Sequence, residues 1–126
     1  MGSALARAAQ KGAPEGTALY LANRTPEKAQ ALCRELPGAR AASNEEIARA
    51  CDLIFLGVKP QMMAGMLEGI RPALAARKDR FVLATMAAGL SCARIRELAG
   101  VSCPVIRLMP NTPSAIGAGV VQYCGL

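Results

Sequence analysis

The sequence contains no histidine and no tryptophan, and aromatic residues make up only 3% of its 126 residues. Without histidine, the chain lacks the commonest general base and the commonest metal ligand. Its five cysteines are an odd number, spread widely and without a Cys-x-x-Cys pair. We therefore predict no metal site, and thiols that stay reduced in a cytoplasmic protein.

Long apolar runs are also missing. No stretch approaches the roughly 20 apolar residues of a membrane span, and the first residues lack the basic and apolar segments of a secretory signal. The net charge of +6 suggests a nucleic-acid partner. However, the basic residues are scattered, and the aromatic residues that stack on bases are nearly absent. We predict neither a membrane partner nor a nucleic-acid partner. A modest positive field suits an anionic cofactor instead.

Segments of helical and strand character alternate along the chain. Apolar runs between turn residues predict strands at 17–22, 53–58, 81–85 and 104–109, with 119–123 as a further candidate. Helices are predicted at 3–11, from Pro26 to before Gly38, and over 43–50, 60–76 and 92–99. Such alternation is typical of a parallel sheet covered by helices. We predict one α/β domain over residues 1–126, Rossmann-like and doubly wound, with a mostly parallel sheet and helices on both faces.

Several local signals support these boundaries. Thr25 is a candidate N-cap, with Pro26 at the first helical position. Ser43 followed by Glu46 has the spacing of a capping box. The run Leu53–Val58 is apolar at every position except Gly57, a pattern typical of a strand buried on both faces.

The most informative stretch is Arg107–Ser114, in which Pro110, Asn111, Thr112 and Pro113 directly follow an apolar strand. The two prolines end the strand and leave a stiff loop at its carboxyl end. Open α/β sheets bind their ligands at that end. This loop is therefore predicted to face cofactor and substrate, although a rigid turn without a ligand is the alternative.

Two other strand ends carry similar candidates. One is the turn formed by Gly57, Val58, Lys59 and Pro60, in which the proline forces Lys59 into an extended conformation and delays the next helix. The other is formed by Met86, Ala87, Ala88 and Gly89, whose small residues allow a flat ring to approach the backbone. Ordinary connections between strand and helix would explain each turn equally well in isolation.

Taken together, these motifs resemble pyrroline-5-carboxylate reductase, with the Pro110–Pro113 segment the most specific match. The resemblance implies that Gly2 is the third glycine of a Gly-x-Gly-x-x-Gly turn and that Asn44 lies near the adenosine end of a dinucleotide. It also implies hydride transfer from a nicotinamide to the imine carbon of a small-molecule substrate, giving L-proline. That reaction needs no catalytic triad, because the cofactor carries the chemistry.

Coenzyme preference is read from Asn23, Arg24 and Thr25, about 20 residues after Gly2, where this fold places its ribose-binding residue. An acidic residue there would accept hydrogen bonds from the ribose and repel a 2′-phosphate. A guanidinium pairs with phosphate instead. We therefore expect NADP(H) to be favoured over NAD(H).

Two departures from the family pattern qualify the resemblance. The family has a strand and most of a glycine-rich turn before the position of Gly2, and it continues after Leu126 into a helical domain. That domain supplies the dimer interface and much of the substrate pocket. We expect a cofactor domain that lacks its first strand, has little activity alone, and belongs to a homo-oligomer when full length.

Two other functions stay open from the sequence. One is a different NADP-dependent reductase, such as a 3-hydroxyacid dehydrogenase. The other is a non-catalytic dinucleotide-binding or interaction module.

Overall fold

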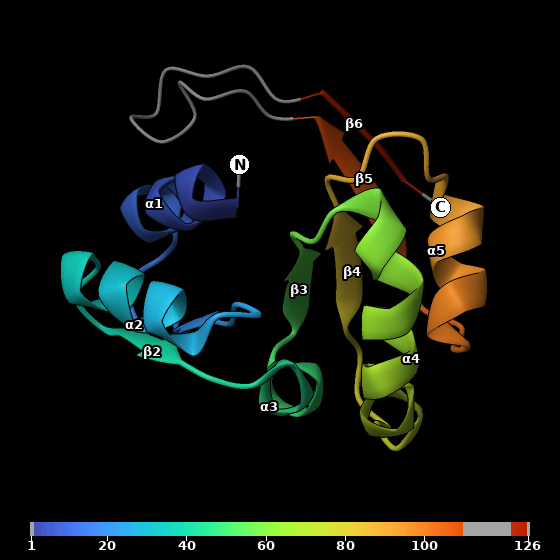
Figure 1. The fold of residues 1–126 in the computed structure, drawn as a ribbon, viewed down its shortest axis with the longest axis horizontal. Coiled ribbons are helices and arrows are strands. Elements are labelled where there is room, and N and C mark those ends of the chain that lie inside the picture. Colours follow the sequence, from blue (N-terminus) through green and yellow to red (C-terminus); the bar gives the residue numbers. More distant parts are fainter. Residues whose placement is uncertain (1, 110–121, 126) are drawn as a thin grey trace. The chain divides into compact units, whose positions relative to one another are not determined.

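A computed structural model describes residues 2–109 and 122–125 of the chain (Figure 1). Its elements, in order, are α1 (Gly2–Gly12), β1 (Leu19–Leu21), α2 (Pro26–Glu35), β2 (Ala39–Ala41), α3 (Asn44–Ala50), β3 (Leu53–Leu56), α4 (Pro60–Ala75), β4 (Val82–Thr85), α5 (Cys92–Ala99), β5 (Val105–Met109) and β6 (Gln122–Gly125). The described residues divide into two compact units, the first ending at Ile47 and the second beginning at Ala48 and including β6.

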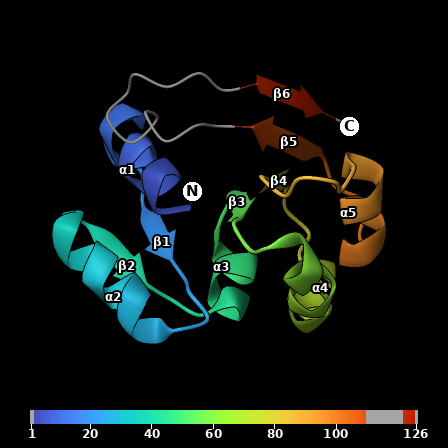
Figure 2. The same cartoon turned by 45° about the horizontal axis from the view of Figure 1, so that its top comes forward.

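The first unit is built on a pair of short parallel strands. β1 and β2 pair with Leu19 opposite Ala39 and Leu21 opposite Ala41. Helix α2 packs along both strands, as Figure 2 shows. Its buried Ala29 and the buried Leu36 just after it contribute to a small apolar core.

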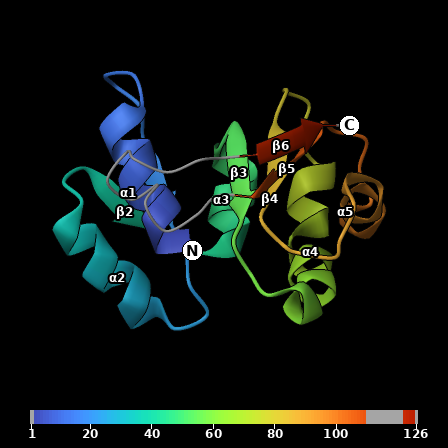
Figure 3. The same cartoon turned by 90° about the horizontal axis from the view of Figure 1, so that it is seen from above.

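The second unit contains a four-stranded sheet in the order β3-β4-β5-β6. The first three strands are parallel and β6 is antiparallel to β5. Ile54, Leu83 and Val105 are adjacent in this register and are at most 4% exposed. Helices α4 and α5 lie on the same side of this sheet, as Figures 1 and 3 show. One face of the sheet and these two helices therefore form the main core.

Most of the predicted elements are confirmed, including the alternation of helices with parallel strands. One strand was not predicted: β2 consists of Ala39, Arg40 and Ala41, none of them β-branched or aromatic. Its extended conformation depends on pairing with β1, so tertiary context overrides its low strand propensity. Of the candidate strand 119–123, the structure describes residues 122 and 123, which lie in β6, and the other three are outside the described residues.

The prediction that the run Leu53–Val58 is a strand buried on both faces is wrong. Ile54 and Leu56 are buried, but Leu53 is 50% exposed and Phe55 is 41% exposed. Successive strand residues point to opposite faces, so the burial of Ile54 and Leu56 indicates that α4 and α5 cover the face that these two residues share. Continuous hydrophobicity therefore did not distinguish a strand with one covered face from a strand with two.

A guanidinium joins the segments at the amino ends of β3 and β4. The Arg77 side chain is only 5% exposed. Its Nη1 donates to the backbone oxygens of Ala48, at 3.0 Å, and Cys51, at 2.5 Å. Its Nε and Nη2 donate to the two carboxylate oxygens of Asp79, at 2.9 and 2.5 Å, and its plane lies over the Phe81 ring, 4.6 Å from the centroid. This planar, two-pronged geometry is specific to arginine.

The pairing of Arg77 with Asp79 predicts a pH dependence of stability. The hydrogen-bonded guanidinium holds the pKa of Asp79 below its usual range. A carboxyl whose pKa is depressed by folding stabilises the fold above its unfolded-state pKa of about 4, and this contribution disappears as the pH falls through the folded-state value. Asp79→Asn should therefore lower the urea midpoint at pH 7 and have a smaller effect at pH 3, as measured by far-ultraviolet circular dichroism.

Asp52→Asn is the matched control, since the Asp52 carboxylate is 92% exposed and lies 3.8 Å from Arg77. It should change the midpoint little at either pH. Equal losses for Asp79→Asn at pH 7 and pH 3 would contradict the assigned role of the carboxylate charge.

The core of the second unit predicts a contrast between two leucines. Leu83 in β4 is completely buried, whereas Leu53 in β3 is half exposed. Leu83→Ala should lower the free energy of unfolding by about 3 kcal/mol, because it removes buried contacts and leaves a cavity. Leu53→Ala should cost less than about 1 kcal/mol, because only part of its apolar surface is buried. Urea denaturation measures both, and equal costs would refute the assignment of the covered face.

Candidate functional site

The carboxyl ends of β1 and β2 enclose a hollow in the first unit. Leu21 is opposite Ala41, and the amide of Ala42 donates to the Leu21 oxygen at 2.9 Å, so the two chain segments leave the sheet side by side. The hollow has a volume of about 440 Å³. Its lining consists of Ala22, Asn23, Pro26, Ala29, Gln30, Ala41, Ala42, Ser43, Asn44 and Glu46.

Two of the residues predicted to bind cofactor, Asn23 and Asn44, thus line the same hollow. They come from different connections, one between β1 and α2 and the other between β2 and α3. Arg24 and Thr25 follow Asn23 directly but do not contribute to the lining. Sequence reasoning missed Gln30 as a lining residue, because its position in the second turn of α2 carries no motif.

The turn at Asn23 has a specific local structure. Its Oδ1 accepts a hydrogen bond from the amide of Thr25 at 2.9 Å, a turn typical of asparagine. Thr25 occupies the N-cap position with an extended backbone, and Pro26 begins the helix. The Thr25 side chain makes no capping hydrogen bond, so the predicted cap is correct in position and wrong in its contact. Asparagine, rather than threonine, fixes the entry into α2.

The predicted capping box at the start of α3 is confirmed. The amide of Glu46 donates to Ser43 Oγ at 3.1 Å, and the amide of Ser43 donates to Glu46 Oε2 at 2.8 Å. The two bonds fix both side chains, which contribute to the lining of the hollow.

In the second unit, the register places two predicted turns at one edge of the sheet. Leu56 is opposite Thr85, so the turns beginning at Gly57 and Met86 leave adjacent parallel strands at the same level. Lys59 has φ −63° and ψ 149°, which confirms the extended conformation predicted for the residue before Pro60.

The second of these turns needs its glycine. Gly89 has a φ of +79°, a conformation that other residues adopt only with strain. The turn contains a buried Ala87, followed by exposed Ala88 and Gly89. The predicted residues from Gly57 to Pro60 and from Met86 to Gly89 therefore lie on neighbouring strand ends.

Thr85 is a contributor to this site that sequence reasoning missed. Its side chain is completely buried. Its Oγ1 accepts a hydrogen bond from the amide of Ala87 at 3.2 Å. The hydroxyl therefore fixes the first bend of the turn. As the last residue of an apolar strand, it carried no signal beyond its polarity.

Some predicted residues are not tested by the structure. The loop of Pro110, Asn111, Thr112 and Pro113 lies outside the described residues. Gly2 is the first residue of α1, and its role in a glycine-rich turn is not tested. The roles predicted for these residues stay predictions.

The thiols of Cys51 and Cys103, both in the second unit, are poor nucleophiles. Burial raises the pKa of Cys51, with Arg77 acting against that shift, and burial likewise raises the pKa of Cys103 against the influence of Arg96. A raised pKa keeps a thiol protonated at neutral pH, whereas nucleophilic cysteines have lowered values.

The described residues contain no group of three or more cysteine or acidic side chains arranged to hold a metal ion. None of the described helices combines the length and hydrophobicity needed to cross a bilayer.

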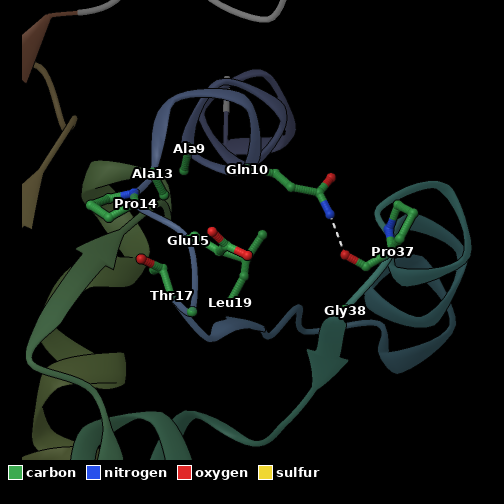
Figure 4. A pocket seen from close by; sticks show the side chains of 10 residues that line it. Ala9, Gln10, Ala13, Pro14, Glu15, Thr17, Leu19, Pro37 and Gly38 are labelled. Atoms are coloured by element: carbon green, nitrogen blue, oxygen red, sulfur yellow. Dashed lines mark hydrogen bonds between the residues drawn. The ribbon is translucent and has the colours of Figure 1, made fainter.

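A smaller hollow of about 240 Å³ lies at the opposite ends of the same two strands (Figure 4). Its lining includes Gln10, Glu15, Leu19 and Gly38, and the Gln10 side-chain amide donates to the backbone oxygen of Pro37. Because ligands of open α/β sheets bind at the carboxyl ends of the strands, the larger hollow is the candidate site.

Comparison with known proteins identifies the family. Residues 1–88 match the model of the family described as "NADP oxidoreductase coenzyme F420-dependent". The chain belongs to this family. It is 35% identical over 102 residues to pyrroline-5-carboxylate reductase of Corynebacterium melassecola, covering 81% of this chain, and 35% identical over 98 residues to that of Escherichia coli, covering 78%.

Solved structures support the predicted Rossmann-like fold. A pyrroline-5-carboxylate reductase from Coxiella burnetii matches 99% of this chain with a TM-score of 0.84 and 21% identity. The pyrroline carboxylate reductase of Plasmodium falciparum, solved with NADP bound, matches 99% with a TM-score of 0.76 and 25% identity. The chain spans 38% and 35% of the two sequence relatives and 46% and 44% of the two structures.

The Thr85 hydroxyl predicts the behaviour of two variants. Thr85→Val keeps the shape but removes the acceptor, which leaves the buried amide of Ala87 unpaired at a cost of about 1–3 kcal/mol. Thr85→Ser keeps the acceptor and loses only a methyl group, worth about 0.8 kcal/mol. Urea denaturation should rank the valine variant as the less stable. Hydrogen exchange of the Ala87 amide should accelerate more in Thr85→Val than in Thr85→Ser, and the reverse order would exclude this hydrogen bond.

Proposed function

We propose that this chain is the dinucleotide-binding part of a reductase that converts 1-pyrroline-5-carboxylate to L-proline with NADPH. One observation carries the proposal: the hollow at the carboxyl ends of β1 and β2 combines Asn23 with Asn44 and has Arg24 beside it in sequence. The similarity to pyrroline-5-carboxylate reductases supplies the substrate and the reaction.

The hollow suits the adenosine half of a dinucleotide. Its volume falls within the range of small-molecule sites. Its walls combine apolar residues such as Pro26 and Ala29 with the neutral hydrogen-bonding side chains of Asn23, Gln30 and Asn44. Such a lining can hold a flat base and a ribose, while the exposed guanidinium of Arg24 is available for a 2′-phosphate.

From the family resemblance, we also propose that the turns in the second unit bind the coenzyme. Lys59 adds a positive charge at the end of β3, where the pyrophosphate would bind. The small residues Ala88 and Gly89 leave their backbone accessible at the end of β4, where the nicotinamide would bind. The bound coenzyme would supply the hydride, and these residues would bind and orient it. The Pro110–Pro113 loop is proposed to contact the reactive ring and the substrate.

These proposed roles, in which the coenzyme supplies the hydride and the protein binds and orients it, agree with the chemistry of the side chains. The chain has no histidine, and the thiols of Cys51 and Cys103 have raised pKa values. Hydride transfer requires two oriented reactants and little acid–base assistance from side chains. We also propose, from the family resemblance, that the complete enzyme is a homo-oligomer.

Arg24 gives the test of coenzyme binding. The chain should bind NADPH more tightly than NADH in a titration followed by nicotinamide fluorescence. Arg24→Gln should weaken NADPH binding roughly tenfold and leave NADH binding nearly unchanged, because a hydrogen bond to a charged group contributes about 1.5 kcal/mol or more.

Arg34→Gln is the matched control. It removes the same charge from the last turn of α2, at the opposite end of the helix from Arg24. It should leave both affinities within about twofold of the original chain, because exposed charges more than about 10 Å apart are largely screened. Equal effects of the two variants would refute a phosphate site at Arg24, and failure to bind either coenzyme would refute the proposed function.

A further inference from the structure

The candidate hollow has a single charged side chain in its lining, and that side chain is acidic. Of the residues that line it, only Glu46 is ionisable at neutral pH. It lies on the wall formed by the connection between β2 and α3. Asn23 and Pro26 contribute to the same lining from the connection between β1 and α2. The two connections therefore differ in charge, since one contributes a carboxylate to the lining and the other carries Arg24 directly after Asn23.

The carboxylate is held in place. Glu46 Oε2 accepts the Ser43 amide at 2.8 Å, while the Glu46 amide donates to Ser43 Oγ at 3.1 Å. Rotating the side chain away from the hollow would break the first of these bonds and leave the Ser43 amide without its partner. A second carboxylate oxygen is still available to accept a hydrogen bond. A bound ligand therefore meets a fixed negative charge.

The two forms of the coenzyme would respond to this charge in opposite ways. The ribose of NADH carries a 2′-hydroxyl, which can donate a hydrogen bond to a carboxylate. The ribose of NADPH carries a phosphate with a charge of nearly −2, which a carboxylate repels. In Rossmann folds an acidic residue performs this discrimination from the end of the strand that leads into the ribose-binding turn. Here that turn contains Arg24, and the acidic residue comes from the next connection.

Building on the proposed function, we propose that Glu46 is a specificity-determining residue that opposes Arg24. Arg24 attracts the 2′-phosphate and Glu46 repels it, so the coenzyme preference is the net result of the two. The preference for NADPH over NADH is accordingly modest, and the domain binds both.

The test is calorimetric titration of the 126-residue chain with NADPH, NADH, adenosine 2′-monophosphate and adenosine. Glu46→Gln retains a capping-box residue at this position and should preserve the fold, which thermal melting verifies. It should tighten the binding of NADPH and adenosine 2′-monophosphate roughly fivefold, from the loss of one repulsion in a partly solvated site. Adenosine should bind as before, and NADH should bind no more tightly.

Glu15→Gln is the matched control. Glu15 lines the smaller hollow at the opposite end of β1, so the variant removes an equal charge from the same unit. It should leave all four affinities within about twofold, since exposed charges at that separation are largely screened. The double variant Arg24→Gln with Glu46→Gln should show an NADPH-to-NADH preference between those of the two single variants.

The outcomes separate the two proposals. If the unaltered chain binds the coenzymes but Glu46→Gln shifts the preference no more than Glu15→Gln does, the role of Glu46 is refuted and the proposed function stands. If the unaltered chain binds neither the coenzymes nor adenosine, both proposals are overturned.

Discussion

Parallel pairing of short strands is the constraint on which the candidate site depends. Parallel strands bring their carboxyl ends to one edge, so each connection to the following helix begins beside its neighbour. The match of Leu21 with Ala41 places Asn23 and Asn44 on one hollow. The match of Leu56 with Thr85 places the turns after β3 and β4 together. A slip of one residue in the pairing of β3 with β4 would turn the buried Ile54 and Leu56 outward, and a slip in either pair would shift the residues of the site relative to one another.

Much of the fold was predictable because the local signals were strong and consistent. Proline at the first position of α2 and α4, serine before α5, and the capping box of α3 all mark true helix starts. Failures occurred where structure depends on a partner distant in sequence. Ala39–Ala41 forms a strand only because β1 lies beside it. The exposure of Phe55 depends on which face α4 and α5 cover, and hydrophobicity alone does not carry that information.

The candidate site was predictable to a similar extent. Residues at strand ends were found from proline and glycine positions, and the structure brings Asn23 together with Asn44. The sequence did not indicate that Glu46 lies in the same hollow, because a capping box explains that residue completely without a ligand. It also gave no weight to Thr85, whose importance comes from complete burial. In both cases the decisive observation, the place of Glu46 in the lining of the hollow and the complete burial of Thr85, comes from the three-dimensional arrangement.

Arg77 has a consequence for how this sequence can diverge. Its guanidinium is bound by the main-chain oxygens of Ala48 and Cys51. Every amino acid provides such an oxygen, so, as far as this contact is concerned, position 51 can change freely during evolution. Position 77 cannot change in the same way, because no other side chain combines several hydrogen-bond donors in one plane with a permanent positive charge. Relatives that share this junction should therefore retain the arginine while the residues around it vary.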